Sequence, residues 1–188
     1  MYKVMGIDPS TKTGICKLDA SNEALEYETQ LVYSVVDSKT QMNHMHRVKF
    51  IVDTVMAHVY SFEPNLVVVE NYSFASKFVS FTAVEINAIL RWQLFDNHIP
   101  YILVPPTKLK KFITGKGNAK KDVMRLEVYK HWGVEAKTDD EIDAFGLALF
   151  GAAYRKFVRG FPKVNMSAVI DNDIEVVEYD INLTNGRK

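Results

Sequence analysis

Disulfide bonds and membrane spans are the first features that this sequence lacks. Its 188 residues include a single cysteine, Cys16, so no disulfide can form within the chain. No apolar run approaches the length of about 20 residues that a membrane-spanning helix needs. The apolar start of the chain reaches Asp8 too early for a secretory signal peptide. These absences predict a cytoplasmic protein without a membrane partner, long enough for one domain with a substantial core.

The sequence also lacks an excess of charge of either sign. Its 23 Lys and Arg residues balance 23 Asp and Glu residues, which gives a formal net charge of 0. The charges are nevertheless unevenly distributed. Residues 105–131 carry eight Lys or Arg and two acids, whereas residues 169–180 carry five acids and no Lys or Arg. A basic block that is balanced by an acidic tail predicts a local anion-binding surface.

Two kinds of site are missing as well. The five histidines and the single cysteine form no cluster with the spacing of zinc ligands. The segment Thr114-Gly115-Lys116-Gly117 lacks the spacing of a nucleoside-triphosphate loop, so no nucleotide cofactor is expected.

The apolar pattern predicts an α/β fold with five strands and five helices. Three antiparallel strands come first, and strand–helix units follow, which indicates a five-stranded mixed sheet with helices on both faces. Asn118 is the expected N-cap of the fourth helix. Residues 174–183 are a candidate for an added strand, and residues 185–188 for a frayed end. The expected strands are 2–8, 15–19, 27–36, 66–70 and 100–104, and the expected helices are 39–62, 77–97, 107–113, 119–132 and 138–158.

Carboxylates recur at the ends of these predicted elements. Asp8 ends the first strand, Glu70 ends the fourth, and Asp140 and Asp143 lie one turn apart at the start of the last helix. If the first and fourth strands are parallel neighbours, all four acids converge at one edge of the sheet. Such a cluster needs cations to stay ionised, and oxygen ligands favour Mg²⁺ or Mn²⁺. Two such ions could clamp the attacking and leaving oxygens of a phosphodiester.

Each acid also has a purely structural interpretation. Asp8 could simply open the turn that follows it. The helix dipole favours acids such as Asp139, Asp140 and Glu141 in the first turn of a helix. Asp143 is harder to explain in this way, because it lies on a mostly apolar helix where unpaired acids are rare.

Four motifs follow one another along the chain. They are Gly6-Ile7-Asp8-Pro9 with Thr13-Gly14, Val67-Val68-Val69-Glu70, Gly115-Lys116-Gly117-Asn118-Ala119-Lys120-Lys121, and Asp140-Glu141-Ile142-Asp143-Ala144-Phe145-Gly146-Leu147-Ala148. In this order they resemble a known family, the RuvC-type Holliday junction resolvases. The likeness covers residues 1–154 and implies a ribonuclease H-like nuclease domain over residues 1–160, and the short, Lys-rich, tailed form looks more like the bacteriophage versions. Residues 161–188, whose acidic tail has no counterpart in the family, are expected to form an acidic extension.

The resemblance implies a metal-dependent, structure-selective DNA endonuclease. Such resolvases act as homodimers on branched DNA and cut four-way junctions by paired symmetric nicks, with Mg²⁺ as the cofactor and Mn²⁺ as a possible substitute. By this likeness the four acids hold two metal ions per active site. Lys121 stabilises the phosphate, and Lys110 matches a residue implicated in the same role or in DNA contact. In a phage-encoded version, the protein would act in the host cytoplasm.

Further residues are expected to contact DNA or the second subunit. Tyr72 and Phe74 flank the position at which the family stacks an aromatic side chain on junction bases. The helix that contains Ala83, Ile86 and Leu90 is apolar on most sides and is the candidate dimer helix. The lysines expected to follow the phosphate backbone, rather than form only a solvated face, are Lys108, Lys110, Lys111, Lys116, Lys120 and Lys121.

Three other functions remain open at this point. Actin-like ATPases and sugar kinases share the first hairpin motif, but they need two such domains. A ribonuclease H-like enzyme could instead cut RNA–DNA hybrids or other branched DNA. A third alternative is a junction-binding module without catalysis, against which the complete set of acids argues.

Overall fold

Six strands form one mixed sheet in the order β3-β2-β1-β4-β5-β6. The computed structural model describes residues 1–21, 25–33, 43–71, 80–157, 163–170 and 174–179. The predicted fold class is confirmed, and all five predicted strands are present. The sixth strand lies within residues 174–183, which the sequence analysis identified as a candidate for an added strand. The strands are β1 Tyr2–Asp8, β2 Lys12–Ala20, β3 Leu25–Tyr33, β4 Leu66–Glu70, β5 Tyr101–Val104 and β6 Glu175–Val177.

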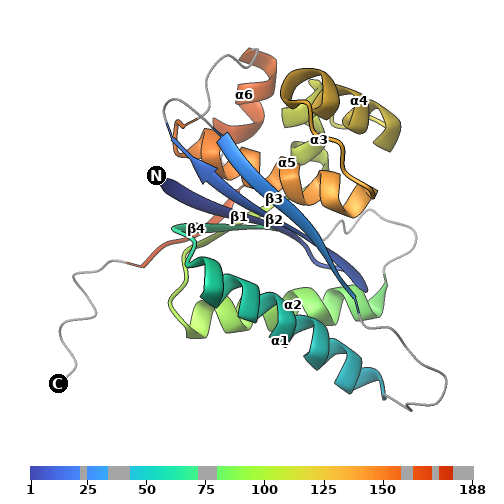
Figure 1. The fold of residues 1–188 in the computed structure, drawn as a ribbon, viewed down its shortest axis with the longest axis vertical. Coiled ribbons are helices and arrows are strands. Elements are labelled where there is room, and N and C mark those ends of the chain that lie inside the picture. The colour runs from blue at the N-terminus through green and yellow to red at the C-terminus, as the bar shows by residue number, and fades with distance from the viewer. Residues whose placement is uncertain (22–24, 34–42, 72–79, 158–162, 171–173, 180–188) are drawn as a thin grey trace.

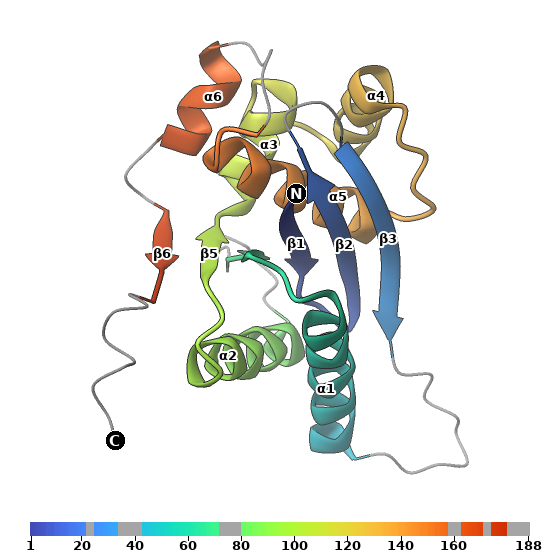
Figure 2. The same ribbon diagram turned by 60° about the vertical axis from the view of Figure 1, so that its left-hand side comes forward.

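Helices cover both faces of this sheet (Figure 1). α1 and α2 lie side by side on one face, while α5 lies on the other with α3, α4 and α6 packed around it (Figures 1 and 2). The helices are α1 His44–Phe62, α2 Phe81–Asp96, α3 Pro106–Thr114, α4 Lys121–Trp132, α5 Asp139–Tyr154 and α6 Lys163–Ile170. Among the described residues, no helix is both long enough and apolar enough to cross a membrane.

Several details differ from the sequence predictions. α1 and α2 begin later than expected, with Asn43 and Ser80 as their N-caps. Asn118 does not cap α4, because that helix begins at Lys121 with Lys120 in the N-cap position and no side-chain cap. α5 ends at Tyr154, earlier than expected. α6 was not predicted, and it is fixed to α3 by the buried Asn165, whose side chain donates a 2.7 Å hydrogen bond to the carbonyl of Phe112.

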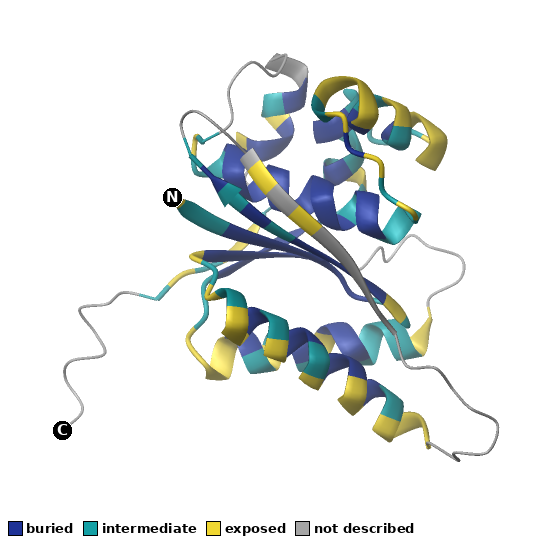
Figure 3. Cartoon of the chain, viewed as in Figure 1, coloured by how far each residue is buried: buried dark blue, intermediate teal, exposed yellow. Residues whose placement is uncertain are grey.

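The alternation of side chains along the strands divides the core into two clusters. On β1, Val4 faces α5, whereas Met5 and Ile7 face α1 and α2. The apolar stripe predicted for α1 is buried against the second cluster, from Val48 to Val59. Figure 3 shows the result: the central strands and α5 are buried, while α1 keeps an exposed outer side.

Two glycines bring α5 unusually close to the sheet. A Cβ built on Gly6 would lie 2.0 Å from the carbonyl oxygen of Ala144 and 2.5 Å from the amide nitrogen of Ala148. A Cβ on Gly14 would lie 2.1 Å from the carbonyl oxygen of Asp140. Because these contacts are with helix backbone, no side-chain movement could relieve them. The first half of α5 therefore rests directly on β1 and β2.

Replacement of Gly6 by Ala should push α5 away from β1. We expect the free energy of unfolding to fall by about 1–3 kcal/mol, the usual effect of overpacking a core. Urea denaturation of the purified protein measures this loss. Gly133→Asn is the matched control, because a Cβ at Gly133 meets nothing within 4 Å and Asn tolerates its φ of +67°. An unchanged stability of Gly6→Ala would contradict the close packing.

Candidate active site at the edge of the sheet

Asp8 and Glu70 end two neighbouring parallel strands. β1 and β4 pair with Ile7 opposite Val69, so the next residues along the two strands are Asp8 and Glu70. Because side chains alternate, Asp8 lies on the same face as Val4, toward α5. The same rule places Glu70 on that face of β4. The prediction that the acids converge depended on parallel pairing of these two strands, and that pairing is present.

The start of α5 brings Asp140 and Asp143 to the same edge. Thr138 caps the helix, and the Glu141 carboxylate accepts a 2.9 Å hydrogen bond from the Thr138 backbone N–H. This capping box gives Glu141 a structural role. Gly14 lies opposite Asp8 in the β1–β2 pair and touches the backbone of Asp140. The first turn of α5 is thereby fixed beside the end of β1.

Burial changes the proton affinity of the two strand-end acids. Desolvation raises the pKa of Asp8, which is only 8% exposed, and raises the pKa of Glu70 well above its usual value. A hydrogen bond between the two side chains lowers the pKa of Asp8 and raises the pKa of Glu70 further. Glu70 therefore holds a proton more tightly than an exposed glutamate does. The charge of Asp140 also raises the pKa of Asp8.

Asp143 belongs to the same electrostatic cluster. Burial, together with the negative charge of Asp8, raises its pKa to about 7, against the opposing effect of Lys121. Because this pKa is near neutral, a cation or an anion that binds beside Asp143 would change the charge of its carboxyl group.

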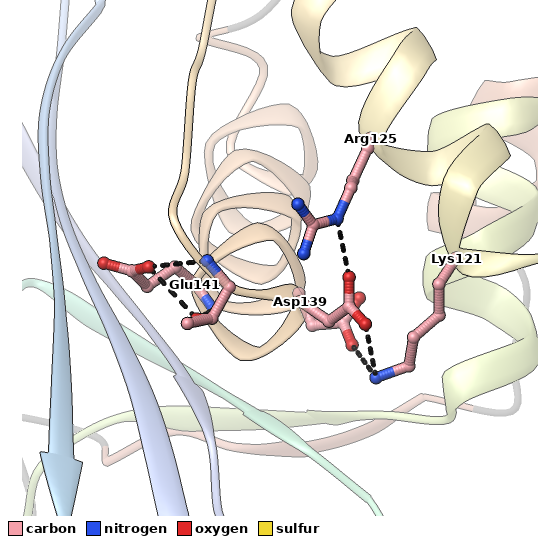
Figure 4. A network of polar contacts seen from close by, with 6 residues as sticks. Lys121, Arg125, Asp139 and Glu141 are labelled. Atoms are coloured by element: carbon pink, nitrogen blue, oxygen red, sulfur yellow. Dashed lines mark hydrogen bonds and ion pairs between the residues drawn. The ribbon is translucent and has the colours of Figure 1, made fainter.

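Basic side chains from α4 reach the start of α5 (Figure 4). The Lys121 Nζ lies 3.8 Å from Oδ2 of Asp143 and 3.7 Å from Oδ2 of Asp139. The Arg125 Nε donates a 2.7 Å hydrogen bond to Oδ1 of Asp139. Of the residues predicted for the site, Lys121 is therefore the cation that contacts an acid of the cluster.

The chemistry of this donor set fits divalent metal ions with oxygen ligands. Desolvation raises the pKa of Asp8, Glu70 and Asp143, and the charge of Asp8 raises the pKa of the other two further; a divalent cation would offset that repulsion. Among the described residues, no three Asp, Glu, His or Cys side chains are arranged closely enough to bind a metal ion without moving. Lys121 supplies positive charge beside these acids, with its Nζ 3.8 Å from Oδ2 of Asp143.

The predicted basic surface begins at the same edge of the sheet. β5 pairs Val104 with Glu70, and α3 starts two residues later at Pro106. The α3 lysines are only partly exposed, whereas Lys116 and Lys120 are exposed around the glycine loop that leads to α4. Gly115, with a φ of +77°, ends α3 and reverses the chain there. The partly exposed lysines of α3 are Lys108, Lys110 and Lys111.

Some candidate residues lie outside the described chain, and others were missed. Tyr72 and Phe74, predicted to contact DNA bases, fall within residues 72–79 and are not described. Sequence reasoning gave no role to Arg125, and it assigned Asp139 only to the helix dipole. It also missed Asn87 of α2, which is 3% exposed and donates a 2.7 Å hydrogen bond to the carbonyl of Glu70. A polar residue within an apolar helix was the available signal for Asn87.

α2 keeps a row of aromatic side chains on its outer side. Ile86 and Leu90 pack into the core, whereas Phe81, Trp92 and Phe95 are 84%, 63% and 52% exposed. These three residues are the large apolar side chains on the outer face of the candidate dimer helix. Exposed apolar groups that follow one helix in this way are typical of an interaction surface.

Comparison with known proteins places this geometry in a family. The family model described as Crossover junction endodeoxyribonuclease RuvC matches residues 4–150. A curated relative of that name from Brachyspira hyodysenteriae is 29% identical over 156 residues, which cover 79% of this chain and 92% of the relative. One from Prochlorococcus marinus is 23% identical over 151 residues, with 79% and 96% covered.

A solved structure shares the fold. "T. thermophilus RuvC in complex with Holliday junction substrate" superposes with a TM-score of 0.69 at 22% identity, over 83% of this chain and 96% of that one. The family match spans every element that carries the four acids, from β1 to α5. The chain therefore belongs to the RuvC family of crossover junction endodeoxyribonucleases.

Proposed function

We propose that this protein resolves four-way DNA junctions as a homodimer, by paired symmetric nicks that require Mg²⁺. The observation that carries the proposal is the convergence of Asp8, Glu70, Asp140 and Asp143 at one edge of the sheet. These residues come from β1, β4 and α5, and the register of β1 with β4 and the capped start of α5 hold them there. Membership in a nuclease family supports the same conclusion.

Two Mg²⁺ ions per active site fit the four acids, with Mn²⁺ as a substitute. Asp8, the most central of the acids, would contact both ions, while Glu70 and Asp143 would hold one each with help from Asp140. When bound, such a pair stabilises the attacking and leaving oxygens of a phosphodiester. The burial of Asp8 keeps water away from its carboxylate and so strengthens its attraction to a cation.

The lysines have two roles in this proposal. Lys121 is close enough to Asp143 to reach a phosphate held beside that acid, where its ammonium would stabilise developing negative charge. The exposed Lys116 and Lys120 would follow the DNA backbone, together with Lys110 and Lys111 of α3, whereas the Nζ of Lys108 is buried in this structure. We assign Tyr72 and Phe74 to contacts with unpaired bases at the junction.

Cleavage of a labelled synthetic four-way junction tests the function most simply. We expect paired symmetric nicks that appear only with Mg²⁺ or Mn²⁺. Asp8→Asn should reduce cleavage at least about 100-fold, because it removes the central charge of the site, and should leave junction binding intact. Gel analysis beside duplex, flap and RNA–DNA hybrid controls measures both activities.

The other outcomes of that experiment are equally informative. Cutting confined to the hybrid would keep the acidic site but replace junction resolution by a ribonuclease H activity. Undiminished cleavage by Asp8→Asn would contradict the assignment of the site. Tight junction binding without any cleavage would identify a binding module, in which the acid cluster is not a working site.

Metal binding should become tighter as the pH rises. Asp143 must lose its proton to hold a cation, and its pKa is about 7. The affinity for Mn²⁺, measured by calorimetry, should therefore increase from about pH 5 to about pH 8 and then level off, because protons compete for the ligands. Glu127→Gln, which removes an acid outside the site, should leave this curve unchanged. Affinity that is independent of pH over this range would contradict the shared site.

The dimer should depend on the outer face of α2. Trp92 is 63% exposed on that face, so Trp92→Glu should place a charge in an apolar interface and yield monomers. Light scattering measures the mass, and the junction assay should show single rather than paired nicks. Leu126→Glu is the control, since Leu126 is 49% exposed but lies on α4, across the sheet. A dimer that survives Trp92→Glu would exclude this face.

A further inference from the structure

Asp139 lies between two cations of α4. Its Oδ1 accepts the 2.7 Å hydrogen bond from Arg125 Nε, and its Oδ2 lies 3.7 Å from Lys121 Nζ. Figure 4 shows both α4 side chains reaching down to this carboxylate at the start of α5. One carboxylate therefore makes a separate contact with each cation, one through each oxygen.

The contact with Asp139 would restrict the position of the Lys121 ammonium, which Lys121 needs in order to act on a phosphate at the site. Its side chain is 55% exposed, and its four-carbon chain is flexible. Without a contact, the ammonium group would therefore occupy many different positions. Its second contact, 3.8 Å from Asp143 Oδ2, is with an acid that is proposed to hold a metal ion. Asp139 differs from Asp143 because it is outside the proposed set of metal-holding acids.

We propose that Asp139 is a positioning residue that holds Lys121 at the edge of the acid cluster, with Arg125 as its anchor. This inference rests on the proposed nuclease function of the site. The planar guanidinium of Arg125 fixes the orientation of the Asp139 carboxylate, so that its second oxygen faces Lys121. The ammonium is then placed beside Asp143 before any phosphate arrives, which lowers the entropy lost on reaching the reactive arrangement.

A purely structural link between α4 and α5 is the competing explanation. The Asp139 side chain is 36% exposed and that of Arg125 is 42% exposed. Ion pairs as exposed as these contribute little to the stability of a folded protein. Variants at either position should therefore fold, and their effect on Lys121 can be measured separately.

The experiment compares five single variants in the junction assay, of which Asp139→Glu is the conservative replacement. Asp139→Asn and Arg125→Gln break the proposed support, and Lys121→Ala removes the group that it supports. Glu127→Gln is the matched control, because Glu127 pairs with Lys130 and His131 on the same helix at 3.3 Å each but is not part of the Lys121 network. Single-turnover cleavage rate, junction dissociation constant and melting temperature are measured for each.

We expect Asp139→Asn to slow single-turnover cleavage about tenfold through misplacement of Lys121, and Arg125→Gln to slow it less. Junction affinity and melting temperature should stay as in the parent protein. Asp139→Glu should recover most of the rate, and Glu127→Gln should match the parent.

A double-mutant cycle decides whether Asp139 acts through Lys121. In the Lys121→Ala background, Asp139→Asn should slow cleavage by less than about twofold, because residues that act together are not additive. If the rate reduction in the double variant equals the product of the reductions in the two single variants, the inference is overturned, while the nuclease function stands. An Asp139→Asn rate equal to that of the parent would overturn it as well.

A measurement without cleavage distinguishes a failure of this inference from a failure of the proposed function. A carbodiimide joins an amine directly to a carboxylate only when the two groups touch. Mass spectrometry should detect a link between Lys121 and Asp139, both in the parent protein and in Asp143→Asn. Loss of the link in Arg125→Gln would support the anchoring role of Arg125. Absence of the link from the parent would overturn the positioning role, even if the protein cuts junctions.

Discussion

Helix α5 can lie against β1 and β2 only because no side chain stands at Gly6 or Gly14. A single Cβ at either position would enter the backbone of the helix, at 2.0 Å from the Ala144 carbonyl oxygen or 2.1 Å from that of Asp140. Parallel pairing of β1 with β4 alone would bring together two acids. The close approach of α5 adds Asp140 and Asp143, so the packing of one helix on one sheet edge sets the composition of the site.

This packing has an electrostatic consequence. Buried carboxylates that face one another are unfavourable when ionised, which is why burial raises the pKa of Asp8, Glu70 and Asp143. Hydrophobic packing around α5 and the two core clusters supplies the stability that tolerates such a group of acids. The same unfavourable charge would attract cations, so the cost to folding and the proposed catalytic function have one origin.

The sequence allowed prediction of the elements with a strong local pattern. Strand-end acids such as Asp8 and Glu70, and the spacing of Asp140 and Asp143, were visible because each follows from the period of its own element. The support of Lys121 by Asp139 was not, because Lys121 and Asp139 belong to different helices and meet only through tertiary packing. Asn118 was a plausible cap by residue type, but α4 begins at Lys121. Local propensity places an element better than it places its ends.

The central claim is that acids from β1, β4 and α5 form one site for divalent metal ions. Anomalous scattering from a crystal of the protein soaked in Mn²⁺ tests it most directly. The account predicts two Mn²⁺ peaks, both bordered by Asp8, with Glu70 beside one and Asp143 beside the other. If a crystal soaked in saturating Mn²⁺ shows peaks elsewhere on the protein but none between these acids, the central claim is contradicted.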